Sequence, residues 1–242
     1  MTTAAATPLR IALPGGGSTS AVLLQPDDVL AAFVFAHGAG AGMNHAFMAS
    51  LAAALGRRGI ATLRFQFPSM EAGSKRPDVP AVAHGAIRAA VAGIRERLPD
   101  VPLLAGGKSF GGRMTSQAQA LEPLGAQGLI FVGFPLHPAG KPATERAAHL
   151  AQVDVPMLFL QGTRDALADL ALVRETVGGL GPRATLHVVD GADHSFHVPA
   201  RSGRTDGEVI EELADAVLGW ITSGLPRTAR PPRPAAARAR GA

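Results

Sequence analysis

A serine lies between glycines near the middle of the chain, in the order Gly107-Lys108-Ser109-Phe110-Gly111. This G-x-S-x-G pattern follows a short apolar run that starts at Leu103 and precedes an amphipathic segment, so it predicts a sharp turn between a strand and a helix. Glycine suits such a turn because strand and helix pass close to each other there. We predict that Ser109 is a nucleophile and that the amide of Phe110, at the helix N-terminus, favours an oxyanion.

Two other interpretations of this stretch need no nucleophile. A glycine-rich turn between a strand and a helix can be purely structural. The same residues also end a phosphate-binding loop of the form G-x-x-x-x-G-K-S. The first glycine of that pattern is replaced by Pro102, and no later apolar run ends directly in the aspartate that a magnesium site would need. The sequence therefore disfavours nucleotide binding.

A serine hydroxyl needs a base, and histidine is the usual one. Among the eight histidines, His194 lies in a loop of small and polar residues that follows the last predicted strand. We predict His194 as the base, with His197 as the fallback. His84 and His149 are interpreted as helical surface residues, and His187 as a residue inside a strand, so a structural role is expected for each.

The base needs an acid to orient it, and the loop after the preceding predicted strand supplies one. That loop reads Gln161-Gly162-Thr163-Arg164-Asp165, and we predict Asp165 as the acid. Asp169 is the alternative, although its position suits a helix N-cap better. The resulting order of serine, aspartate and histidine is the order found in α/β-hydrolases.

A second oxyanion donor is expected from residues 37–42, which read His-Gly-Ala-Gly-Ala-Gly after a continuous apolar run. We predict the backbone N–H of Ala39 for this role, with Gly40 beside it, while the side chain of His37 braces the loop. Three residues are candidates for contacting substrate: Gly40, Lys108 and His137. Lys108 could attract an acidic substrate or could point to solvent.

The elements expected to position these side chains alternate along the chain. After an opening hairpin (9–13 and 20–24), strands are predicted at 31–36, 61–67, 128–134, 156–160 and 184–189, in addition to the strand before Ser109. Helices are predicted at 46–58, 79–98, 112–121, 144–150, 169–177 and 205–222. This alternation predicts an α/β fold with a mostly parallel, doubly wound sheet and helices on both faces. Chemistry is expected at the carboxyl ends of the strands.

Length and composition bound the remaining possibilities. The 242 residues are 47% hydrophobic, which suits one domain over residues 1–225. Residues 226–242 are rich in proline, alanine and arginine and predict a disordered tail. That tail carries the basic excess, so no specific nucleic-acid partner is expected. The sequence has no cysteine and no long apolar segment, so thiolate chemistry is excluded and a cytoplasmic protein without membrane insertion is expected.

Together, the motifs at residues 37–40, 107–113, 161–165 and 193–195 resemble the α/β-hydrolase superfamily. They look closest to a branch akin to dienelactone hydrolases and to the testis-expressed and chromatin-complex hydrolase-like proteins. The resemblance covers about residues 9–223, and its most specific part is the Gly-Lys-Ser-Phe-Gly-Gly-Arg run. Dienelactone hydrolases use cysteine as nucleophile, so Ser109 departs from them. The resemblance implies a serine hydrolase fold, and no metal or organic cofactor.

The expected function is an esterase-type serine hydrolase that cleaves a small or medium acyl ester through an acyl-enzyme. The loop after the strand at 128–134 is short, so we expect a minimal cap and an open site. A catalytically quiet module of the same fold, binding a protein or a small ligand, is the alternative. The residues do not separate ester from thioester or amide substrates, or hydrolysis from acyl transfer.

Overall fold

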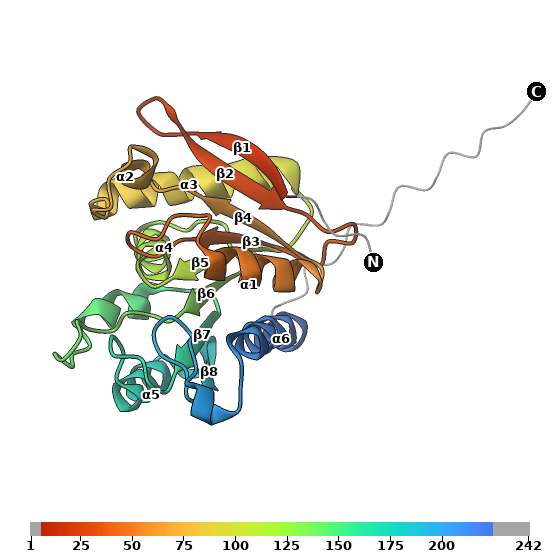
Figure 1. The fold of residues 1–242 in the computed structure, drawn as a ribbon. Helices are drawn as coiled ribbons and strands as arrows, with labels where there is room; N and C mark the ends of the chain where they lie inside the picture. The colour runs from red at the N-terminus through yellow and green to blue at the C-terminus, as the bar shows by residue number, and fades with distance from the viewer. Residues whose placement is uncertain (1–5, 225–242) are drawn as a thin grey trace, which may run out of the picture.

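A computed structural model describes residues 6–224 as an eight-stranded sheet flanked by helices (Figure 1). The strand order is β1-β2-β4-β3-β5-β6-β7-β8. The strands are β1 (Ala6–Ala12), β2 (Ser18–Leu24), β3 (Ala31–Ala36), β4 (Ile60–Phe65), β5 (Leu103–Lys108), β6 (Gly128–Val132), β7 (Met157–Gly162) and β8 (Ala184–Val189). β2 pairs antiparallel with β1 and β4, and all other pairs are parallel.

Helices cover both faces of the sheet. On one face lie α1 (Ala46–Gly56) and α6 (Asp206–Gly224), and on the other lie α3 (Pro80–Arg97), α4 (Phe110–Leu121) and α5 (Leu170–Gly179) (Figure 1). Strand β3 shows why two layers are needed, because all six of its residues are buried. Phe33 and Phe35 pack with α1, while Val34 and Ala36 belong to the core under α3 and α4. A strand covered on both faces is expected to be apolar throughout, and the predicted doubly wound fold is confirmed.

The element boundaries differ from prediction in a few places. A short helix, α2 (Pro68–Glu71), forms between the elements predicted at 61–67 and 79–98, because Pro68 occupies the first helical position and its fixed φ suits a helix start. The helix expected at 144–150 is a 3₁₀ helix, η1 (Glu145–Gln152). Two further 3₁₀ turns are η2 (Gly181–Arg183) and η3 (Ala200–Ser202). The predicted tail at 226–242 lies outside the described residues.

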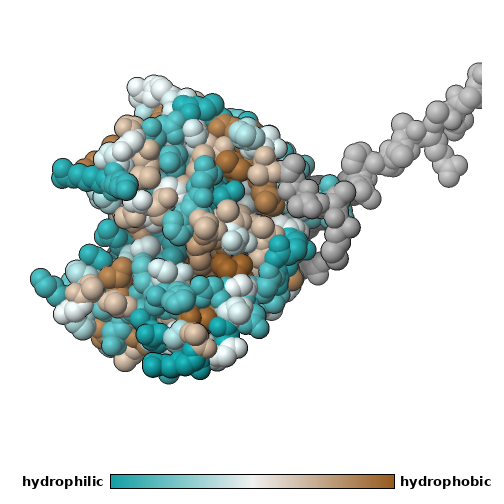
Figure 2. All heavy atoms as spheres, viewed as in Figure 1, coloured by the Kyte–Doolittle hydropathy of each residue, from teal (hydrophilic) through white to brown (hydrophobic). Residues whose placement is uncertain are grey.

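The cap is minimal, as predicted. Between β6 and β7 the chain forms only a loop and η1, with no inserted domain over the sheet edge. In the space-filling view, that edge is indented between the polar surfaces of α2 and η1 (Figure 2). Within residues 6–224, no helix is long and apolar enough to cross a membrane.

Candidate active site

Ser109 forms the turn between β5 and α4. Its backbone has φ 50° and ψ −114°, and it is one of two non-glycine residues with positive φ among those described. Such a conformation costs free energy and survives only where the surroundings enforce it. The flanking glycines are a steric requirement: a Cβ on Gly107 would lie 2.3 Å from the carbonyl oxygen of Ala36, and one on Gly111 would lie 2.5 Å from the same oxygen. The turn therefore exposes the hydroxyl at the carboxyl edge of the sheet.

Three loops bring a serine, a histidine and an aspartate into one hydrogen-bonded chain. His194 Nε2 lies 2.9 Å from Ser109 Oγ, and His194 Nδ1 lies 2.7 Å from Asp165 Oδ2. An ionised carboxylate can only accept, so Nδ1 carries the proton and Nε2 accepts from the serine. The Asp165 side chain is 1% exposed and that of His194 is 24% exposed, so the imidazole reaches solvent while the carboxylate is buried behind it.

The carboxylate of Asp165 accepts two further hydrogen bonds. Gln161 Nε2 donates to Oδ2 at 2.6 Å, and the amide of Leu167 donates to Oδ1 at 2.8 Å. Burial raises the pKa of Asp165, but the hydrogen bonds from His194, Leu167 and Gln161 outweigh it and hold the pKa below its usual value. The carboxylate is therefore charged at neutral pH. Sequence reasoning missed Gln161, whose signal was an amide inside an otherwise apolar, fully buried strand.

The two fallback residues lie elsewhere. Asp169 caps α5, where its carboxylate accepts from the amides of Ala171 and Leu172. His197 forms an ion pair with Asp206 at the protein surface, 2.9 Å apart. Neither contacts Ser109.

The loop after β3 lies beside Ser109. A Cβ on Gly38 would lie 3.8 Å from the Cβ of Ser109. His37 is buried, donates from Nδ1 to the carbonyl of Gly38 at 2.7 Å, and accepts from the amide of Phe67 at 3.1 Å. Burial lowers the pKa of His37, so its ring stays neutral and braces the loop.

The two predicted oxyanion donors are free. Within residues 6–224, neither the amide of Ala39 nor that of Phe110 donates a hydrogen bond. Gly40 follows with φ 68°, a left-handed conformation that favours glycine. A Cβ there would meet only the carbonyl of Lys75, 3.6 Å away, so Gly40 borders open space.

The side chain of Lys108 lies against the loop that carries His194. Its Nζ donates to the carbonyl of His194 at 2.5 Å and lies 5.4 Å and 6.0 Å from the ring centres of Phe196 and Phe47. Burial lowers the pKa of Lys108 to about 8, against the opposing effect of Asp165 and Asp193. The position does not support the predicted substrate contact, because the ammonium group already serves an internal partner.

His137 is also placed differently from its predicted role. It is 3% exposed, and both ring nitrogens contact backbone: Nδ1 donates to the carbonyl of Pro138 at 2.9 Å, and Nε2 accepts from the amide of Asp169 at 2.8 Å. The ring ties the loop after β6 to the start of α5. It offers no free polar atom to a substrate, so its position does not support a substrate contact.

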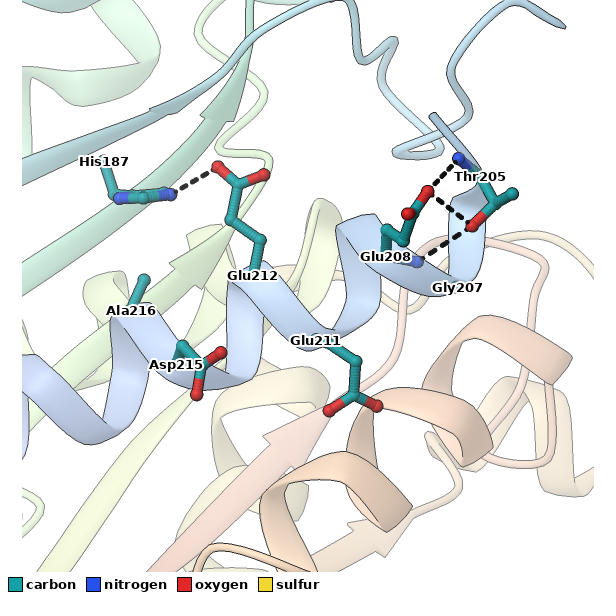
Figure 3. A pocket seen from close by; sticks show the side chains of 8 residues that line it. All are labelled: His187, Thr205, Gly207, Glu208, Glu211, Glu212, Asp215 and Ala216. Atoms are coloured by element: carbon teal, nitrogen blue, oxygen red, sulfur yellow. Dashed lines mark hydrogen bonds and ion pairs between the residues drawn. The ribbon is translucent and has the colours of Figure 1, made fainter. Parts of the chain in front are cut away.

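A separate surface hollow lies along α6, next to His187 on β8 (Figure 3). It is lined by four acidic side chains, but each has a partner. Glu212 binds His187 and Arg204, Glu208 binds Thr205, and the other two, Glu211 and Asp215, bind Arg58. Among the described residues, no cluster of histidine and carboxylate side chains could hold a metal ion. The hollow therefore offers no rival to the chemistry at Ser109.

Comparison with known proteins agrees with this architecture. Residues 29–222 match a family model described as an alpha/beta hydrolase domain. A dienelactone hydrolase from Anabaena variabilis is 18% identical, with 93% of this chain and 100% of that chain covered at a TM-score of 0.75. An α/β serine hydrolase without a lid from Xanthomonas campestris is 24% identical, with 95% and 99% covered at 0.70. An α/β serine hydrolase homologue from Coxiella burnetii is 22% identical, with 88% and 96% covered at 0.71. The structural likenesses show the fold, and the family match over most of the chain shows that it belongs to the α/β-hydrolase family.

Proposed function

We propose that the protein is an esterase-type serine hydrolase that cleaves a small or medium acyl ester through an acyl-enzyme. The single observation that carries this proposal is the hydrogen-bonded chain from Ser109 through His194 to Asp165. Hydroxyl, imidazole and carboxylate in this order are the groups that acyl transfer to serine requires. The open sheet edge and minimal cap favour a small or medium acyl group.

In the first half of the reaction, Ser109 Oγ attacks the ester carbonyl while His194 Nε2 takes the hydroxyl proton. Asp165 stabilises the imidazolium without accepting its proton. The amides of Ala39 and Phe110 donate to the oxyanion of the tetrahedral intermediate, where preorganised donors have most effect. The intermediate then collapses, the bond to the alcohol breaks, and His194 gives its proton to the leaving oxygen.

The second half repeats these steps with water. His194 removes a proton from a water molecule, the hydroxide attacks the acyl carbonyl, and a second tetrahedral intermediate forms. Its collapse breaks the bond to Ser109 Oγ, which recovers a proton from His194. The acid is released and the free enzyme is restored, so no cofactor enters the balance.

A fluorophosphonate probe tests the nucleophile directly. We expect wild-type protein to be labelled and to hydrolyse p-nitrophenyl esters, and Ser109→Ala to do neither. A panel of p-nitrophenyl esters and thioesters of increasing chain length then defines the substrate class. Wild-type protein that is folded, as judged by circular dichroism, yet neither labelled nor active, would reject this proposal and favour the quiet binding module.

A further inference from the structure

Three basic side chains from three elements gather beside the nucleophile helix. Arg113 comes from the first turns of α4, His84 from the start of α3, and His149 from η1. They are close enough for Arg113 and His84 to repel a proton on His149. Arg146, also on η1, repels Arg113. We refer to Arg113, His84 and His149 as the basic cluster.

The basic cluster has no acidic partner among residues 6–224. Arg113 forms no ion pair there and its side chain has no hydrogen-bond acceptor, although its Nε is fully covered. The Nε2 atom of His84 is covered and unpaired as well, although the ring also forms a hydrogen bond with the side chain of Gln117. Burial, with a smaller repulsion from Arg88, lowers the pKa of His84. Buried polar atoms are nearly always paired, and a guanidinium nitrogen can only donate, so the unpaired Nε of Arg113 indicates a donor that lacks an acceptor.

Other arginines of the same fold show the contrast. Arg88, one turn after His84 on α3, pairs with Glu122 at 3.4 Å and donates to the carbonyl of Ala118 at 2.7 Å. Arg58 pairs with Glu211 and Asp215. Asp154, which follows η1 in the chain, accepts a hydrogen bond from Gln119 at 2.9 Å. Among residues 6–224, a half-buried guanidinium with five donors and no acceptor is therefore unusual, and it occurs at Arg113 and at Arg146 beside it.

The pKa values in the basic cluster are lowered, as expected for buried basic groups that have no acid beside them. Burial and the repulsion from Arg113 and His84 lower the pKa of His149 to about 4. Ser116 Oγ donates to the carbonyl of Arg113 at 2.9 Å and lies 2.8 Å from His149 Nε2, so the neutral ring donates from Nε2. Burial and then Arg146 lower the pKa of Arg113. An anion would relieve this repulsion.

The basic cluster lies at the edge of the sheet that carries Ser109. The amide of Arg113 donates to the carbonyl of Ser109 at 3.1 Å, so the two residues are one helical turn apart. Side chains on a helix lean toward its N-terminus, which directs Arg113 toward the Ser109 end of α4. α3 also begins at this edge (Figure 1).

We infer that Arg113, with His84 and His149, binds a carboxylate or phosphate group carried by the ester substrate. This inference rests on the proposed function and narrows its substrate class to anionic esters. The guanidinium group suits both anions, because its planar donors can make two parallel bonds to them. Protonation of His149 would accompany binding, since the anion offsets the repulsion that keeps the ring neutral.

Binding is tested without turnover in the Ser109→Ala protein. Glutarate and inorganic phosphate are titrated by calorimetry, with 1,5-pentanediol as the neutral control, and the arm that binds identifies the anion. We expect binding to weaken at least about tenfold in Arg113→Gln, as for loss of a hydrogen bond to a charged group. Arg113→Lys, which keeps the charge, should lose less. Arg174→Gln, which removes an exposed arginine near the start of α5, should bind as the parent does.

Two further readouts complete the test. Anion binding should strengthen relative to His149→Asn as the pH falls from about 7.5 to about 5.5, and this comparison cancels the protonation of the anion itself because both proteins bind the same anion. A kinetic readout uses protein that keeps Ser109. The ratio of kcat/KM for p-nitrophenyl hemiglutarate, an anionic ester, to kcat/KM for p-nitrophenyl valerate, a neutral one, should fall about tenfold in Arg113→Gln. Labelled, active enzyme that shows no Arg113-dependent binding or preference would overturn this inference alone. Wild-type protein without labelling would overturn the proposed function, and the assignment to an ester with it.

Discussion

Two cationic residues flank Ser109 in the chain, and their surroundings differ. Lys108, immediately before Ser109, donates to the carbonyl of His194 and lies against two aromatic rings. Arg113, one turn after Ser109, has no acceptor among the described residues. A cation with an internal partner fixes the position of a neighbouring loop, whereas a cation without one is free to meet a ligand. The turn at Ser109, which we call the elbow, therefore has a cation that is paired within the chain on one side and, on the other, a cation that we propose is paired by an anion.

The complete side depends most strongly on Asp165. In Asp165→Asn the amide can no longer favour the Nδ1–H tautomer of His194, and we expect kcat to fall about 10⁴-fold, as for tautomer loss in other triads. Ester hydrolysis under saturating substrate measures the effect. Asp169→Asn is the matched control, because Asp169 only caps α5. Equal losses in the two variants would mean that Asp165 does not orient the base.

Lys108 is expected to have the next largest effect. Lys108→Met removes a charged donor from the carbonyl of His194, and we predict a fall in kcat of about 10- to 100-fold from loss of a hydrogen bond to a charged group. Lys108→Arg should restore part of the activity. The loss should appear in kcat more than in KM, because the ammonium group positions the base without touching substrate. A change confined to KM for acidic esters would instead make Lys108 a substrate contact.

The dependence of activity on pH tests the same positioning role of Lys108. Its pKa of about 8 predicts that activity declines above that pH as the ammonium group loses its charge, and that this decline is absent from Lys108→Met. Stability should change in the opposite direction. Between about pH 8 and the unperturbed pKa of about 10.4, the unfolded chain binds more protons than the folded one, so the free energy of unfolding rises with pH. Denaturant unfolding across this range checks the sign, with Lys108→Met as reference.

The contrast between Lys108 and Arg113 also marks where sequence reasoning stops. The sheet, the elbow at Ser109 and the loops that carry Asp165 and His194 follow local rules: apolar runs, glycines at tight turns, and the placement of polar loops after strands. The partner of Lys108 is set by packing between segments 86 residues apart. His84 and His149 carry a helical pattern that does not reveal that their helices converge on Arg113. Sequence reasoning therefore predicts the strands and the main helices, but it misses α2 and the 3₁₀ character of η1, and the contacts between loops require the fold.

A smaller effect is expected for His137, and substitution there distinguishes a structural role from a contact with substrate. His137→Gln disturbs hydrogen bonds to Pro138 and Asp169, so we predict a loss of about 1 to 2 kcal/mol in the free energy of unfolding. The kcat/KM for short p-nitrophenyl esters should stay unchanged. Urea unfolding and steady-state kinetics on the same preparation measure both. A fall in kcat/KM without a loss of stability would return His137 to the substrate-contacting residues.

The smallest effect is expected on α6, far from the elbow. Glu211 pairs with Arg57 and Arg58, but its side chain is 45% exposed, and ion pairs in contact with water contribute little. We therefore predict that Glu211→Gln lowers the free energy of unfolding by at most about 1 kcal/mol, less at high salt, and leaves ester hydrolysis intact. Measuring the urea midpoint at low and high salt tests this. A larger loss in the free energy of unfolding that persists at high salt would contradict this prediction. It would show that Arg57 and Arg58 need an acidic partner to be stable in the fold, whereas Arg113 is accommodated without one.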